Sequence, residues 1–93
     1  MQYVLITHEV EDYLHWKKGF DAAADLRKQA GEIEFQVLKY EGDANHVVHF
    51  SRWRSLSAAK AFFESDQVNK IRADLGVKRP EFVYLNQDAA GIL

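Results

Sequence analysis

Two histidines and a short alternating row of polar and aromatic side chains are the parts of this sequence best suited to chemistry. His49, Ser51 and Trp53 alternate along the segment His46–Trp53, so in a strand they would share one face. An imidazole near neutrality can take a proton from a phenolic ligand, and an indole can stack on an aromatic ring. His8 lies in another predicted strand and could converge with His49. His49 and His8 are therefore the candidate catalytic residues.

The same row also has a structural interpretation. His49 would then be hydrogen-bonded inside a core, and Trp53 would fill the corner between its strand and the next helix. The residues that we predict to line a ligand site are Trp53, Ser51, Tyr84, Trp16, Phe62 and Asn86. An aromatic residue at helical spacing, such as Trp16, is more often a core residue, so this alternative stays open for it as well.

Neither a metal nor a cofactor is expected. The chain has no cysteine, which removes disulfides, thiolate catalysis and thiolate metal ligands together. His46 and His49 are three apart on a strand and face opposite sides, whereas His8 and His49 would supply only two ligands without a matched carboxylate. No phosphate-binding loop or dinucleotide fingerprint occurs.

Length and charge narrow the class of protein further. At 93 residues, the chain is expected to form a single domain over residues 1–93. The net charge of −2 comes without a polybasic run, so neither nucleic acid nor a membrane surface is expected as a partner. No apolar run approaches the roughly 20 residues of a membrane span, and we expect a cytoplasmic protein.

The elements that must position the candidate residues alternate between strands and helices. Asp12 is predicted to cap the first helix, and Ser55 or Ser57 the second. In chain order, the patterns predict a strand over Tyr3–Val10, a helix from Asp12 to Gly31, a strand over Ile33–Tyr40, a turn over Gly42–Asn45, a strand over His46–Trp53, a helix with Leu56 and Phe63 on its buried side, a helical turn from Asp66 to Gly76 and a strand over Glu81–Asn86.

The order βαββαβ predicts an α+β, ferredoxin-like two-layer sandwich with a four-stranded antiparallel sheet. Right-handed crossovers place the first and third strands in the middle of the sheet, with both helices on one face. The other face then lacks a cover, and we expect a homodimer that closes the two sheets into a dimeric α+β barrel. Whether the row of His49 faces the helices or the barrel interior stays open, because one step of register reverses the assignment.

Three stretches carry a family resemblance over nearly the whole chain. They are THEVEDYLHWKKGFD (Thr7–Asp21), HFSRWRSLSAAKAFFESD (His49–Asp66) and LGVKRPEFVYL (Leu75–Leu85). Through them the chain resembles the dimeric α+β barrel proteins of the antibiotic-biosynthesis-monooxygenase type. The resemblance implies a homodimer with a ligand cavity in each subunit, between the sheet and its helices. The activities in this group include cofactor-independent oxygenation of aromatic polyketides and degradation of heme.

The heme-degrading branch of this group can be compared residue by residue. It places a Trp on the second helix and a heme-ligating His ten positions later. An alignment on the pair Ser65-Asp66 puts Phe62 and Arg72 at those positions. Phe62 lacks the indole, and Arg72 does not lose its proton to bind iron, so the resemblance does not imply heme degradation here.

Three functions stay open at this point. The first is a cofactor-independent monooxygenase, or a related enzyme, acting on an aromatic, quinone or polyketide-like substrate. Such chemistry needs a substrate that donates an electron as an anion, together with a base and an apolar pocket. The alternative is a non-catalytic, ligand-binding or stress-responsive dimeric barrel. A third is an interaction module whose cavity is filled by its own aromatic residues. In the first two cases the partner is a small aromatic or apolar ligand.

Overall fold

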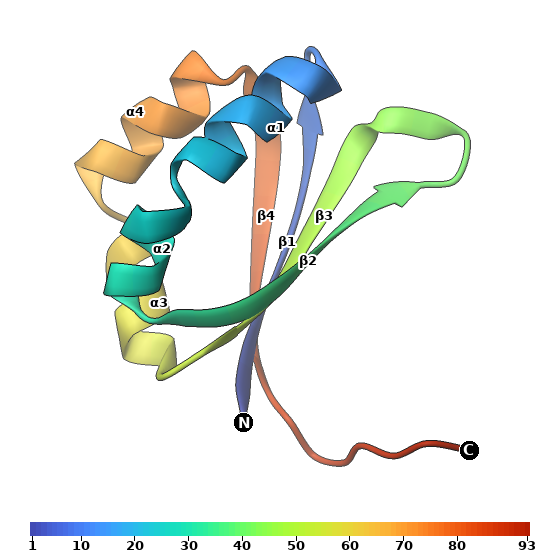
Figure 1. The fold of residues 1–93 in the computed structure, drawn as a ribbon, viewed down its shortest axis with the longest axis vertical. Helices are drawn as coiled ribbons and strands as arrows, with labels where there is room; N and C mark the ends of the chain where they lie inside the picture. The colour runs from blue at the N-terminus through green and yellow to red at the C-terminus, as the bar shows by residue number, and fades with distance from the viewer.

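A computed structural model, which describes residues 1–93, contains one four-stranded antiparallel sheet with its four helices on one face (Figure 1). The strands are β1 (Gln2–Val10), β2 (Glu32–Tyr40), β3 (Asp43–Trp53) and β4 (Val77–Asn86). The helices are α1 (Tyr13–Ala22), α2 (Ala24–Ala30), α3 (Leu56–Phe63) and α4 (Asp66–Asp74). The strand order β2-β3-β1-β4 puts the first and third strands in the middle, which confirms the predicted α+β, ferredoxin-like sheet.

The prediction of one continuous helix from Asp12 to Gly31 was wrong. The helix breaks at Ala23, whose φ of −91° and ψ of 9° lie outside the helical range and whose N–H is shared between the carbonyls of Gly19 and Phe20. No proline or glycine stands at this break, so the continuous apolar stripe of the sequence could not indicate it. None of the four helices is long and apolar enough to cross a membrane.

The caps of the helices differ in part from those predicted. Asp12 stands at the N-cap of α1, but its side chain makes no capping hydrogen bond. Instead, the side-chain oxygen of Asn45, on β3, accepts the N–H of Tyr13 at 3.1 Å. Ser55 caps α3 by accepting the N–H of Ala58 at 3.1 Å, which resolves the choice between Ser55 and Ser57. A long-range contact thus replaces the local cap at the start of α1.

Two strand boundaries also differ from those predicted. The turn between β2 and β3 lies at Glu41-Gly42, so the predicted turn over Gly42–Asn45 was placed too late; Asp43 to Asn45 already belong to β3. β4 begins at Val77 and includes Pro80, which an edge strand tolerates because its missing N–H can face solvent. The hairpin end of β2 and β3 projects beyond the helical layer (Figure 1).

Burial alternates strictly along the two central strands. On β3 the buried residues are Val47, His49, Ser51 and Trp53; on β1 they are Val4, Ile6, His8 and Val10. These side chains face the helices, where they meet two groups of core residues around Phe63 and Phe20. The row that begins with His49 therefore points into the space between sheet and helices, and the question that register left open is decided.

A bulge at the start of β2 changes which residues face the helices. Glu32 pairs with Trp53 and Glu34 pairs with Arg52, so Ile33 is an extra residue on β2. Because of this extra residue, Glu32 faces the helices and is buried, while Glu34 lies on the opposite face and is exposed. Simple alternation would have put both glutamates on the same side.

The opposite sheet face has no helix over it. Apolar side chains lie open there, with Leu38 of β2 48% and Val83 of β4 44% exposed. Tyr3 and Phe50 stack on this face with ring centres 5.1 Å apart. Beyond β4, the chain from Gln87 to Leu93 extends away from the sheet (Figure 1).

Gly19 on α1 lies against the side chain of Leu75, at the end of α4. A Cβ atom at position 19 would stand 2.3 Å from Leu75 Cδ2, closer than carbon atoms can approach. We expect Gly19→Ala to lower the free energy of unfolding by about 1–3 kcal/mol through overpacking, although alanine favours helix by about 1 kcal/mol. Urea unfolding measures the change. In the Leu75→Ala variant, which lacks the clashing side chain, Gly19→Ala should be neutral or stabilising. If Gly19→Ala stabilised the wild-type chain, the predicted clash would be contradicted.

Candidate functional site

A cavity of about 80 Å³, partly open to solvent, lies between the helices and β1, β3 and β4. Its wall is mainly apolar, and the polar side chains that line it are those of His8, Arg27, His49 and Arg72. Ligand sites usually measure several hundred Å³, and an engineered cavity of about 150 Å³ binds benzene. In this form the cavity therefore holds at most part of one ring, and a larger ligand must extend through the opening or displace the helices.

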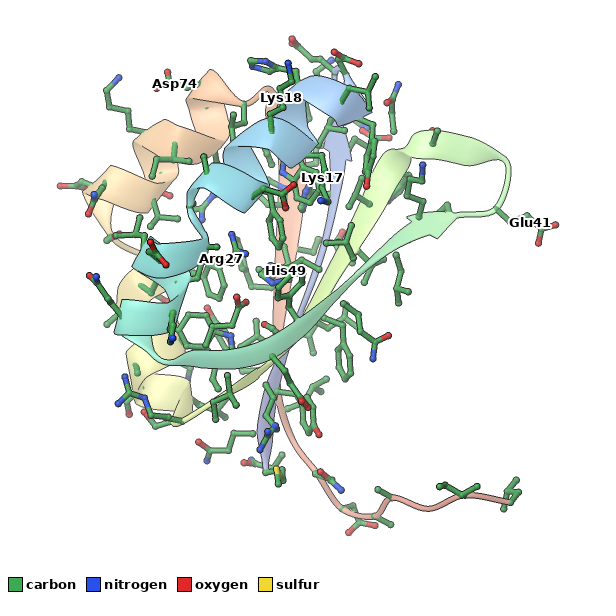
Figure 2. All side chains as sticks on the ribbon, in the orientation of Figure 1. Lys17, Lys18, Arg27, Glu41, His49 and Asp74 are labelled. Carbon is green, nitrogen blue, oxygen red and sulfur yellow. The ribbon has the colours of Figure 1, made fainter.

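A buried network of three ionisable side chains lies at one end of this cavity. Nε of Arg27 donates to Oε1 of Glu32 at 2.7 Å, and the other oxygen of Glu32 is 2.7 Å from Nε2 of His49. The side chains of Arg27, Glu32 and His49 are each about 5% exposed. Figure 2 shows Arg27 and His49 close together between α2 and the sheet. The network joins α2, β2 and β3 around a single carboxylate.

Arg27 is held by further contacts within the core. A terminal nitrogen of its guanidinium donates to the carbonyl oxygen of Phe20. The guanidinium carbon lies 3.7 Å from the ring centre of Phe20 and 5.3 Å from that of Phe35. Such cation–π contacts stabilise a desolvated guanidinium that lies against the faces of aromatic rings. The anion that Arg27 meets is the protein's own Glu32.

The carboxylate of Glu32 is ionised. Burial alone would raise its pKa, but the hydrogen bond and charge of His49, together with those of Arg27, outweigh burial and hold the pKa below its ordinary value. An ionised carboxylate only accepts hydrogen bonds, so Nε2 of His49 must carry the proton that it shares with Glu32. When the ring is neutral, Nδ1 is the nitrogen with a free lone pair. A carboxylate that orients an imidazole in this way prepares it to accept a proton.

His8 is a second buried imidazole in the cavity wall. It is 5% exposed, and neither ring nitrogen has a hydrogen-bond partner. Its ring centre lies 5.3 Å from that of Trp16. Burial lowers the pKa of His8 to about 4, helped by the charges of His49, Arg72 and His46. His8 is therefore neutral near pH 7 and has unused hydrogen-bonding capacity.

Four of the predicted site residues come together around the cavity: His49, His8, Trp16 and Phe62. Ser51 and Trp53 do not line it. Nε1 of Trp53 donates to Oγ of Ser51 at 2.8 Å, and both residues are at most 2% exposed. Their positions match the structural interpretation, in which Trp53 fills the corner between β3 and α3.

The two candidates on β4 lie away from the cavity. Tyr84 packs beside the core cluster around Phe63, with Nζ of Lys60 5.1 Å from its ring centre. Burial, and then the charge of Glu64, raises the pKa of Tyr84. Asn86 is exposed and accepts a hydrogen bond from the side chain of Gln2 at 3.3 Å. Neither side chain lines the cavity, although Tyr84 lies near enough to Arg72 for their charges to interact.

Sequence reasoning missed two residues of this site. Glu32 lay just outside the predicted strand, and the bulge at Ile33 gives it a face that alternation does not predict. Arg72 was considered only as an unsuitable iron ligand, yet its side chain lines the cavity. A polar residue on the same helix face as Val68 and Leu75 was the one available signal for Arg72. No three His, Asp or Glu side chains converge as a metal site would require.

Comparison with known proteins adds a family and a set of similar folds. A sequence model described as "Antibiotic biosynthesis monooxygenase" matches residues 9–74. The fold is similar to SnoaB, a cofactor-independent oxygenase from Streptomyces nogalater, with 12% identity, a TM-score of 0.79 and coverage of 96% of this chain and 94% of that one. No curated protein matches the sequence significantly.

Two further solved structures have the same fold. A monooxygenase from the gene ActVA-Orf6 of Streptomyces coelicolor, in complex with nanaomycin D, is 18% identical, with a TM-score of 0.67 and coverage of 99% of this chain and 91% of that one. The protein PA3566 from Pseudomonas aeruginosa is 13% identical, with a TM-score of 0.71 and coverage of 95% and 94%. At such low identity these similarities establish the fold alone.

Stability should depend on pH through His8. Its pKa is about 4 in the folded protein and about 6.5 when unfolded, so between these values the unfolded chain binds more protons. The contribution is complete above about pH 6.5 and is lost as pH falls toward 4, by up to about 3 kcal/mol. Urea unfolding at pH 7 and pH 5 should show the loss in the wild type and a smaller one in His8→Gln.

This comparison separates His8 from Glu32. The pKa of Glu32 is lowered in the folded protein, so its contribution to stability is present above its ordinary value of 4.5 and is lost only below it. Equal losses of stability in the wild type and in His8→Gln between pH 7 and pH 5 would contradict the assignment to His8.

Proposed function

We propose that this chain, which belongs to the antibiotic biosynthesis monooxygenase family, binds a small aromatic ligand in its cavity and oxygenates it without a cofactor. The observation that carries the proposal is the hydrogen bond between His49 and the buried carboxylate of Glu32, because it leaves the other ring nitrogen of His49 available as a base beside an apolar cavity. A base and an apolar pocket suffice for an acidic phenol or enol to react with dioxygen as its anion.

The reaction that we propose balances without an added reductant. His49 takes the proton of a phenol, and the phenolate gives one electron to dioxygen. The two radicals combine at the ring carbon opposite the oxygen, and the peroxide anion that results takes the proton back from His49 to become a hydroperoxide. Loss of water from this hydroperoxide leaves a quinone. One oxygen atom of dioxygen then resides in the new carbonyl group and the other in water, while the phenol has lost its O–H proton and one ring hydrogen.

Each residue of the buried network has a role in this scheme. Glu32 orients the ring of His49 and stabilises the imidazolium that forms when His49 accepts a proton. Arg27 keeps Glu32 ionised and in place. Trp16 and Phe62 supply aromatic walls for a flat ligand.

A non-catalytic, ligand-binding protein is the second candidate. The small size of the cavity favours it, because a cavity that holds at most part of one ring leaves no room for dioxygen beside that ring. The two candidates need the same pocket and differ in whether His49 takes a proton during turnover. Variants at His49 and Glu32 therefore distinguish them.

We expect His49→Ala to lower the rate of oxygenation by roughly 100-fold or more, the usual contribution of a general base, and to change ligand affinity much less. The measurement is dioxygen uptake with a panel of phenols and naphthols, with labelled dioxygen traced into the product. Glu32→Gln should also lower the rate, because a neutral amide does not stabilise the imidazolium. His15→Ala, on the exposed surface of α1, is the matched control.

Saturable binding of these ligands without dioxygen uptake in the wild type would support the non-catalytic candidate. Unchanged uptake in His49→Ala would instead remove His49 from the proposed mechanism.

We also propose that the protein is a homodimer formed through the open sheet face. Support comes from the apolar side chains left uncovered on that face, including Leu38, Val83 and the stacked pair Tyr3 and Phe50. Burying this surface against a second copy would remove apolar area from water, and a two-fold axis would close the two sheets into a barrel. The cavities, on the helical side of each sheet, would stay outside this interface.

Leu38→Glu should weaken the dimer, because it places a charge on the apolar face. Sedimentation or light scattering should give twice the chain mass of 10.7 kDa for the wild type and a larger monomer fraction for the variant. Leu14→Glu is a suitable control, since Leu14 is an exposed leucine on α1, in the helical layer. A wild-type mass of one chain at micromolar concentration would rule out the proposed dimer.

A further inference from the structure

Arg72 lines the cavity with a guanidinium that has no acidic partner. One terminal nitrogen, Nη2, donates to the carbonyl oxygen of Phe63 at 2.8 Å and to the side-chain oxygen of Asn69. The other, Nη1, is buried and has no hydrogen-bond partner. The guanidinium carbon lies 5.0 Å from the ring centre of Phe82. Burial lowers the pKa of Arg72, yet a guanidinium stays charged at neutral pH.

His8 faces the same cavity with both ring nitrogens unpaired. No aspartate or glutamate lines the cavity, and the buried carboxylate nearby, Glu32, is already shared by Arg27 and His49. Buried polar groups are normally paired, because an unpaired donor loses its bonds to water without replacement. The wall therefore carries a positively charged guanidinium, Arg72, and a neutral imidazole, His8, that both have buried nitrogens without a hydrogen-bond partner.

We propose that Arg72 and His8 bind an anionic oxygen of the ligand, so that the cavity takes an aromatic ring as its phenolate or carboxylate. The anion would accept a charge-assisted hydrogen bond from Nη1 of Arg72 and a second bond from the N–H of neutral His8. The ring would lie against the aromatic residues Trp16 and Phe62. This inference rests on the proposed function for the aromatic nature of the ligand, but it requires no turnover.

The arrangement selects against neutral rings. A ligand of the same shape without an acidic oxygen would displace water and leave Nη1 of Arg72 unpaired in an apolar surrounding, which a site built for hydrogen bonding disfavours strongly. The ionised form of a phenol would be favoured over its neutral form, and the site would thus lower the pKa of a bound phenol. Proton removal by His49 and binding of the anion by Arg72 and His8 would both favour the ionised form of the ligand.

The wild-type protein provides the first test, with 4-nitrophenol, 4-nitrobenzoate and nitrobenzene as probes of similar size. Equilibrium binding is measured by quenching of tryptophan fluorescence, and the absorbance of 4-nitrophenol reports its ionisation directly. We expect at least one of the two anions to bind about 10-fold or more tightly than nitrobenzene, a difference of about 1.4 kcal/mol. Preference between phenolate and carboxylate identifies which anion the site takes.

If the phenolate is preferred, 4-nitrophenol bound at pH 6 should absorb as its anion. If the carboxylate is preferred, 4-nitrobenzoate alone should show the gain over nitrobenzene. Equal affinity for all three compounds, tighter binding of nitrobenzene, or no binding of any of them would overturn the inference.

Variants at position 72 provide the second test. Arg72→Met should lower affinity for the preferred anion about 10-fold and leave nitrobenzene affinity within about 2-fold, whereas Arg72→Lys should retain part of the anion preference. Arg54→Met, at an exposed arginine outside the cavity, is the control for a lost charge. Circular dichroism and the melting temperature verify that each variant is folded. An equal loss for anion and nitrobenzene would contradict the role of Arg72.

The two proposals fail separately. Anion-selective binding without dioxygen uptake would refute the oxygenase and leave this site standing. Dioxygen uptake together with a preference for neutral rings would refute the anion site and leave the oxygenase standing.

Discussion

The buried contact of one carboxylate with the side chains of an arginine and a histidine is the interaction on which the rest of this structure depends. Glu32 has its two oxygens on Arg27 and His49, each at 2.7 Å, and so ties α2 to both β2 and β3. Burying charge is costly, and removing one partner of a buried pair typically costs about 3–5 kcal/mol. The network is stable because each charged group meets its complement: the guanidinium also lies on Phe20, and the carboxylate has no oxygen left unpaired. It orients the ring of His49, one of the two imidazoles that face the cavity.

The cavity is lined both by side chains of this hydrogen-bonded network and by buried side chains that lack hydrogen-bond partners. At His49 the polar groups are paired within the protein, so they are preorganised and need no ligand to remain in place. At His8 and Arg72 three buried nitrogens have no partner. The polar groups of this small site are therefore of two kinds: His49 is paired within the protein, whereas His8 and Nη1 of Arg72 are not.

Much of the fold and part of the site could be predicted from local patterns. Alternation along β3 correctly put His49, Ser51 and Trp53 on one face, and the order of elements predicted a sheet with β1 and β3 in the middle. These features follow from period-2 and period-3.6 spacing and from crossover handedness, which act over short stretches of chain. The break at Ala23 and the turn at Glu41-Gly42 were missed, because alanine continues a helix readily and because Asp43 and Asn45 suit a strand end as well as a turn. Asn45 serves instead as a remote cap for α1.

The sequence by itself determined that this chain would form a helix-covered antiparallel sheet with an imidazole row on a central strand. Only the tertiary structure decided what that row does. One extra residue, Ile33, turns Glu32 toward His49, and a helix break precedes the turn of α2 that carries Arg27 to the same carboxylate. Conversely, the hydroxyl oxygen of Ser51 accepts the indole N–H of Trp53, so Trp53 only packs in the core. Hydrogen bonds between residues on different elements need positions accurate to a few tenths of an ångström, and no periodic pattern along a single segment contains that information.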